Sequence, residues 1–182
     1  MSLEELREQN IRLVTEKALE CFIKNGINNT RVSEIAAESG LTQRSVFRYF
    51  PSKDDIVIAA AFCYWERTKA YIARELRRHT DDAQTGIEQI NIILNSYANM
   101  LFVDPEGIRF SLDAEVALYS VGKNAHVINR PPERYEAYKG PLSQAVRRGL
   151  ADGTVDPGAN IKQLYYNCLL YTSDAADDRI SV

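Results

Sequence analysis

TRVSEIAAESGLTQRSVFRYFPSK, residues 30–53, is the stretch that decides the fold. It holds two runs of apolar residues at helical spacing, which let each run bury one side of a short helix. The apolar positions are Val32, Ile35, Ala36, Val46 and Phe50. Between the runs, Gly40 suits a left-handed cap after the first helix, and the Thr42 hydroxyl can cap the second. The stretch therefore predicts a helix-turn-helix.

The second helix of this motif has a polar outer face. With Val46 and Phe50 buried, the side chains left on or near the outside are Gln43, Arg44, Ser45, Arg48 and Tyr49. These donors and acceptors suit base edges and phosphates in DNA. Residues 42–53 contain cations and no acid, although the whole chain has a formal charge of −3. The alternative is the solvated face of an ordinary short helix.

A third helix begins directly after the motif. Ser52 is placed as its N-cap, with Asp55 as the capping-box partner. Lys53 and the free backbone N–H groups of this first turn could hold a phosphate beside the reading helix.

The run GLTQRSVFRYFPSK, residues 40–53, closely resembles the signature of the tetracycline-repressor-like (TetR) family of bacterial transcription regulators, and the match extends over about residues 11–56. The resemblance implies a homodimer with an N-terminal DNA-binding domain and a C-terminal helical domain for ligand binding and dimerisation. Phe47 stands where many members carry a tyrosine whose hydroxyl reaches a phosphate. We expect that contact to be lost, with Arg48 and Tyr49 as candidates to compensate.

The expected DNA contacts follow from these observations. Arg44 is the favoured guanine reader because a guanidinium matches O6 and N7 bidentately. Thr42 and Lys53 are expected to contact phosphates, and Arg31 and Ser33 could touch the backbone. The full candidate set is Arg31, Ser33, Thr42, Gln43, Arg44, Ser45, Phe47, Arg48, Tyr49 and Lys53.

Composition limits the remaining possibilities. The chain has 182 residues, of which 45% are hydrophobic, so it can bury a core. Its acidic balance argues against a nonspecific polyanion binder. It shows neither a long apolar run nor a signal peptide, so we expect a cytoplasmic protein without membrane contact. Cys21, Cys63 and Cys168 are too scattered for a disulfide framework or a zinc site.

The other elements are expected to be helices, which makes the fold class all-α. An N-terminal helix over residues 6–25 braces the motif, and Thr30 is the expected cap of the helix that follows it. Further helices are expected over residues 53–78, 86–102, 105–119 and 133–150, and from about residue 159. The 105–119 helix should carry Ile108, Phe110, Leu112 and Val116. Residues 121–132 form a loop, Pro141 kinks or splits its helix, and residues 151–157 form a turn. The expected organisation is a helix-turn-helix domain at 1–52, an incomplete helical regulatory domain at 53–167, and a non-native tail at 168–182.

The expected tail begins at Cys168. CLLYTSDAADD, residues 168–178, resembles the translation of a transposon-type sequencing adapter. The alternative is an ordinary C-terminal helix with an acidic end. By the resemblance to TetR regulators, the last two helices form most of the dimer interface, so we expect this interface to be incomplete in the chain.

These features favour a ligand-responsive repressor that binds a palindromic DNA operator as a homodimer. An activator of the same family, a helical adaptor and a small helical enzyme are the alternatives; the enzyme is disfavoured because no nucleophile–histidine pair, metal-ligand spacing or phosphate-binding Gly loop is evident. We therefore expect no enzymatic activity, no cofactor and no metal. The effector is an unknown small molecule, and its candidate contacts are Tyr64, Trp65, Tyr97, Met100, Phe110, Glu115 and Tyr119, with ordinary helical core as the alternative reading.

Overall fold

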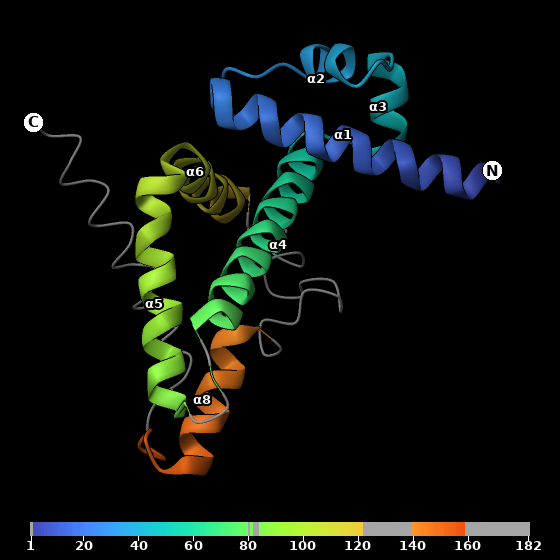
Figure 1. The fold of residues 1–182 in the computed structure, drawn as a ribbon. Helices are drawn as coiled ribbons and strands as arrows, with labels where there is room; N and C mark the ends of the chain where they lie inside the picture. Colours follow the sequence, from blue (N-terminus) through green and yellow to red (C-terminus); the bar gives the residue numbers. More distant parts are fainter. Residues whose placement is uncertain (1, 80, 82–83, 122–139, 159–182) are drawn as a thin grey trace, which may run out of the picture. The chain divides into compact units, whose positions relative to one another are not determined.

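The computed structural model describes residues 2–79, 81, 84–121 and 140–158, all of whose regular elements are α-helices (Figure 1). This confirms the all-α class. The helices are α1 (Leu3–Asn25), α2 (Val32–Glu38), α3 (Gln43–Tyr49), α4 (Lys53–His79), α5 (Gly86–Val103), α6 (Pro105–Val121) and α8 (Pro141–Asp152).

The chain packs as two units. Unit 1 comprises Met1–Glu66 with Glu106–Arg130, and unit 2 comprises Arg67–Pro105 with Pro131–Val182. The helix α4 contributes its first part to unit 1 and its last part to unit 2. These are packing units, and the functional boundary expected after residue 52 stays a prediction.

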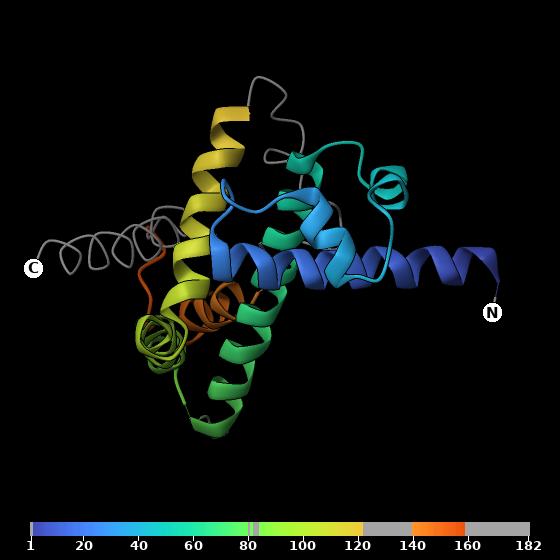
Figure 2. The ribbon, with the colours of Figure 1, turned by 90° about the horizontal axis from the view of Figure 1, so that it is seen from above.

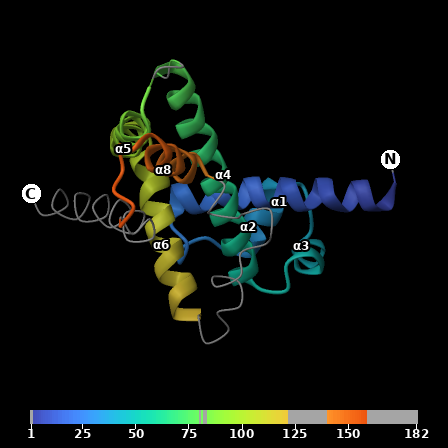
Figure 3. The ribbon, with the colours of Figure 1, turned by 90° about the horizontal axis from the view of Figure 1, so that it is seen from below.

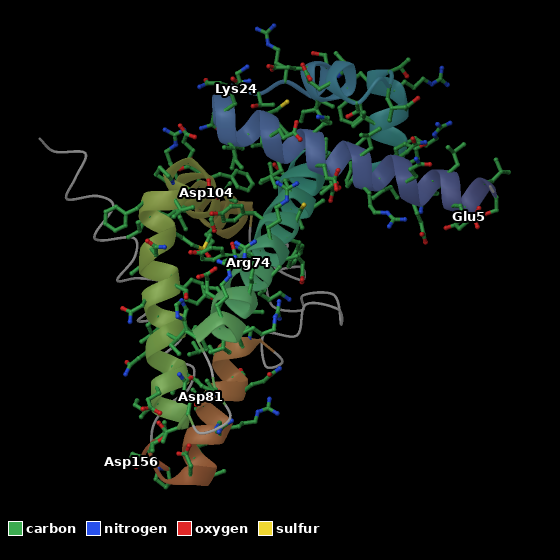
Figure 4. The ribbon with its side chains drawn as sticks, viewed as in Figure 1. Glu5, Lys24, Arg74, Asp81, Asp104 and Asp156 are labelled. Carbon is green, nitrogen blue, oxygen red and sulfur yellow. The ribbon has the colours of Figure 1, made fainter. Side chains whose placement is uncertain are left out.

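Helix α1 is longer than the sequence indicated. Ser2 caps its N-terminus: the Ser2 hydroxyl accepts from the Glu5 backbone N–H at 3.1 Å, and the Glu5 carboxylate accepts from the Ser2 N–H. This capping box extends the helix by almost one turn beyond the expected start at residue 6. The helix ends at Gly26 as expected, where φ is +81°. Figure 4 labels Glu5 and Lys24 near its two ends.

The two helices of the motif pack beside α1. Figure 2 shows α2 crossing α1 at an angle, and Figure 3 shows α3 beside the N-terminal half of α1. Helix α2 contacts both α1 and α3. Gly40 takes φ +65° in the turn, as expected, and Thr42 caps α3 by accepting from the Ser45 N–H at 3.2 Å. The expected helix-turn-helix is confirmed.

The expected cap of α2 was wrong. The N-cap is Arg31, whereas Thr30 is only 1% exposed. The Thr30 hydroxyl donates to the backbone carbonyls of Gly26, at 2.8 Å, and Cys21, at 3.2 Å. Thr30 therefore ties the linker to the end of α1 through a hydroxyl shared by two backbone carbonyls.

Helix α6 belongs to unit 1 through Phe110. The Phe110 side chain is 2% exposed, stacks on Phe22 of α1, and meets the edge of Tyr64 of α4 with 6.1 Å between ring centroids. Val116 of the same helix is 71% exposed. At 100° per residue, Val116 lies far around the helix from Phe110, so both side chains cannot face one core.

Unit 2 is built on α5 and α8, which run side by side (Figure 1). Its core consists of Ile72, Ile90, Ile93, Leu142, Ala145 and Val146. A Cβ atom added at Gly86 would lie 2.0 Å from the Gly149 nitrogen, so the two backbones are in close contact. Glycine is required where helices approach this closely.

Several expectations lie outside the described residues. These are most of the loop at 121–132, the part of the 133–150 helix before residue 140, the helix expected from residue 159, and the tail from Cys168. Within the described part, Pro141 begins α8 at its first helical position, where its missing N–H costs nothing. The turn after α8 is confirmed by Gly153, at φ +77°.

Candidate nucleic-acid interface

The orientation of α3 is set by its buried side. Val46 is 0% exposed and Phe50, directly after the helix, is 7% exposed. Because these residues lie four apart, they fix one stripe of the helix against the core, together with Ile35 of α2. The opposite stripe must face outward.

The outward stripe carries two arginines. Arg44 and Arg48 are exposed and four residues apart, so their guanidinium groups can reach neighbouring points along a groove. Together with Ser45 and Phe47 they line a surface hollow of about 400 Å³. Gln43 is also exposed, at the start of the helix. This is the arrangement of donors that the sequence predicted for the reading helix.

Tyr49 is held by Asn10 of α1, which was not among the expected site residues. Its hydroxyl accepts from the Asn10 side-chain amide at 3.1 Å, and its ring lies 5.4 Å below the Arg48 guanidinium. Because the hydroxyl accepts from Asn10, its own proton remains available to donate. Asn10 lies 39 residues away on α1, so no local spacing could have indicated this contact.

The remaining candidates lie at helix starts. Thr42 caps α3, and its hydroxyl is also 3.0 Å from that of Ser45. Arg31 and Ser33 are exposed at the start of α2. Arg31 is the N-cap there, although Thr30 was expected at that position.

The start of α4 has the expected capping box. The Asp55 carboxylate accepts from the Ser52 N–H at 2.9 Å and from the Ser52 hydroxyl at 2.7 Å, while the Asp55 N–H donates to the Ser52 hydroxyl oxygen. Lys53 is half-buried in the first helical turn. Asp54 and Asp55 bring negative charge to this turn, which opposes the binding of a phosphate there. The Lys53 ammonium is positively charged and is the group in this turn that would attract a phosphate.

The candidate effector residues are divided between the units. Tyr64, Trp65, Phe110 and Glu115 belong to unit 1, and Tyr97 and Met100 belong to unit 2. Tyr64 and Phe110 pack against each other in the core, and Trp65 donates its indole N–H to Ser111 at 3.3 Å. The Tyr119 side chain lies outside the described part. The effector site therefore stays a prediction.

Glu115 is exposed on α6, yet the protein around its carboxyl raises the pKa above the ordinary value by desolvation. Because the residue is exposed, water still reaches this carboxylate and limits its desolvation.

Two further properties concern the described residues alone. No group of three or more His, Cys, Asp or Glu side chains there is placed to hold a metal ion. No helix in the described ranges combines the length and the apolar character needed to cross a membrane.

The helix-turn-helix with outward arginines is an arrangement that suits binding in the major groove of DNA. Residues 14–60 match the sequence profile of the family described as "Bacterial regulatory proteins, tetR family". This part of the chain, which includes α2 and α3, is therefore similar to that family of regulatory proteins.

Two proteins of Bacillus subtilis (strain 168) are similar in sequence. The HTH-type transcriptional regulator YuxN is 30% identical over 90 residues, which is 50% of this chain and 30% of YuxN. The fatty acid metabolism regulator protein is 21% identical over 149 residues, which is 82% of this chain and 72% of that protein. The chain thus spans less than a third of the length of the first relative.

Solved structures show the same fold. A transcriptional regulator from Pseudomonas aeruginosa PAO1 superimposes with a TM-score of 0.65 at 18% identity, covering 96% of this chain and 83% of that one. The regulator FadR from Bacillus subtilis, solved in complex with stearoyl-CoA, has a TM-score of 0.52 at 15% identity, covering 93% and 86%.

Proposed function

We propose that this protein is a ligand-responsive repressor that binds a palindromic DNA operator as a homodimer in the cytoplasm. The observation that carries the proposal is the outward face of α3, where Arg44 and Arg48 stand exposed above a buried side made by Val46 and Phe50. In this proposal α3 enters the major groove, Arg44 reads a guanine, and Lys53 and Thr42 contact phosphates.

A dimer supplies the second half-site. Two copies related by twofold symmetry would place their α3 helices about 34–36 Å apart, one turn of the double helix. The dimer would have two conformations, one with its α3 helices at the DNA spacing and one with them at a different spacing. An effector weakens DNA binding only as far as its affinity for the second conformation exceeds its affinity for the first.

The effector is a small molecule not yet identified, bound among the aromatic residues of the regulatory part. Stearoyl-CoA is the first probe to try, because a regulator with the same fold was solved with it and a sequence relative regulates fatty acid metabolism. Release of DNA by stearoyl-CoA, but not by coenzyme A alone, would support an acyl-chain effector.

The DNA-binding role is tested by selecting sequences from a random duplex library and measuring affinity by fluorescence anisotropy. Arg44→Ala should cost about 1–3 kcal/mol on the selected site and relax the preference for guanine at one position. Lys53→Ala should weaken binding to all sequences and reduce the salt slope by about one.

Arg77→Ala is the matched control, because Arg77 is an exposed arginine in the last turn of α4 and its removal changes the net charge equally. Equal losses for Arg44→Ala and Arg77→Ala would reject the assigned reading role. If no salt-dependent DNA binding is found, a helical adaptor that uses the motif for protein contacts is favoured instead.

A further inference from the structure

Phe47 places an uncharged ring in the middle of a cationic surface. It is 39% exposed, although Val46 and Phe50 of the same segment are buried. The ring lines the 400 Å³ hollow together with Arg44, Ser45 and Arg48. An exposed ring of this size can bury further apolar surface against a partner in the bound state.

The position of Phe47 on α3 decides which partner is available. Arg44 precedes Phe47 by three residues, so the two side chains are neighbours on the outward stripe. If Arg44 reaches the edge of a base pair, Phe47 reaches the edge of an adjacent one. In the major groove, the apolar group that an unmodified base edge presents is the C5-methyl of thymine.

We propose that Phe47 is a specificity-determining residue that contacts the C5-methyl group of a thymine next to the base read by Arg44. This inference rests on the proposed DNA-binding function and adds a second, apolar element to its readout. The expected gain is about fourfold in affinity for each methyl group that becomes buried. A phenylalanine suits this contact because it brings no polar group that would lose its hydration in the groove.

The deoxyribose of the backbone is another apolar surface that a ring could touch. Such a contact would carry no sequence information. The two contacts are separated by removing the methyl group alone, since deoxyuridine pairs as thymidine does and differs only at C5.

The test uses the site that the full chain selects from a random library. The same duplex is prepared once with thymidine and once with deoxyuridine throughout, and each is titrated with the wild type and with Phe47→Ala at one salt concentration. The wild type should bind the deoxyuridine duplex about fourfold more weakly for each contacted methyl. Phe47→Ala should show a similar loss on the thymidine duplex and little further loss on the deoxyuridine duplex.

A second measurement restores the methyl group on a different base. At the thymine position that responds, a cytosine duplex should bind weakly to the wild type, and 5-methylcytosine should recover part of the affinity. Phe47→Ala should not distinguish cytosine from 5-methylcytosine. Its far-ultraviolet circular dichroism should match that of the wild type, because an exposed side chain contributes little to the core.

Three outcomes contradict the inference. Equal wild-type affinity for the thymidine and deoxyuridine duplexes would assign Phe47 to the backbone. An equal deoxyuridine effect in Phe47→Ala would assign the methyl sensitivity to another residue or to DNA shape. If the chain selects no sequence at all, the proposed function fails and this inference fails with it.

Discussion

The rings of Phe22 and Phe110 lie parallel, with their centroids 6.0 Å apart and their planes 6° apart. Phe22 belongs to α1, which braces the reading motif, and Phe110 belongs to α6. The stack therefore joins two helices through residues that are 88 positions apart in the chain. Both side chains are almost fully buried. The stack is therefore part of the core of unit 1.

Truncation of this stack should destabilise unit 1. Phe110→Ala should lower the free energy of unfolding by about 3–5 kcal/mol, because it removes a buried ring and leaves a cavity between α1, α4 and α6. Urea unfolding followed by fluorescence measures this, since Trp65 is the single tryptophan and lies in unit 1. Phe102→Ala is the matched control, because Phe102 is 66% exposed. Similar losses for both variants would refute the assigned core role.

The contact between Asn10 and Tyr49 should matter for DNA binding. Tyr49→Phe and Asn10→Ala should each weaken binding by about 0.5–1.5 kcal/mol, and the double variant should lose little more than either single one. The reason is that Asn10 acts by orienting the Tyr49 hydroxyl. A complete double-mutant cycle by fluorescence anisotropy measures the coupling, and additive losses would show that the two residues act independently.

The chain supplies a control for this cycle. The Tyr71 hydroxyl accepts from the Asn99 amide at 3.2 Å in unit 2, which repeats the same pair of residue types away from α3. Tyr71→Phe and Asn99→Ala should therefore leave DNA affinity unchanged.

The close approach of α5 and α8 predicts that a substitution at Gly86 lowers the stability of unit 2. Alanine is the better helix former, yet Gly86→Ala should destabilise unit 2 by about 1–3 kcal/mol, because the new methyl would overlap the Gly149 backbone. Thermal unfolding by circular dichroism measures the loss. Asn95→Ala, at an exposed position of α5, should have almost no effect. A Gly86→Ala variant as stable as the wild type would contradict this backbone contact.

The stability of unit 2 should fall in acid. Asp152 accepts from the Thr154 hydroxyl and from the Gly86 backbone N–H at the start of α5; these bonds lower the pKa of the Asp152 carboxyl below its ordinary value, with the Thr154 hydroxyl as the largest cause. A depressed pKa in the folded state gives a stabilising contribution that is present above the unfolded pKa. That contribution is lost as the pH falls through the folded pKa.

Asp152→Asn tests this acid dependence. The urea midpoint of the wild type should fall more between pH 7 and pH 3 than that of Asp152→Asn, because the variant has no carboxylate to protonate at this position. Glu88 retains its own lowered pKa, caused first by the Thr85 backbone N–H, so part of the acid dependence remains in the variant. Parallel acid profiles for the two proteins would exclude Asp152 as a contributor.

The sequence by itself determined the reading motif, because its signals are local. Helical spacing predicted that Val46 and Phe50 lie in the core. Gly40 indicated the end of the first helix of the motif, and Thr42 indicated the start of the second. The capping box of Ser52 and Asp55 spans three residues and could be read directly. The outward placement of Arg44 and Arg48 followed from the same geometry.

Only the tertiary structure decided the contacts between distant segments. Thr30 was suited to a helix cap by residue type, but burial against the end of α1 gave its hydroxyl two carbonyl partners instead. Asn10 could not be found, because its partner Tyr49 comes from another helix. Local spacing fixes which residues share a face of a helix, whereas packing against another part of the chain fixes which face is buried.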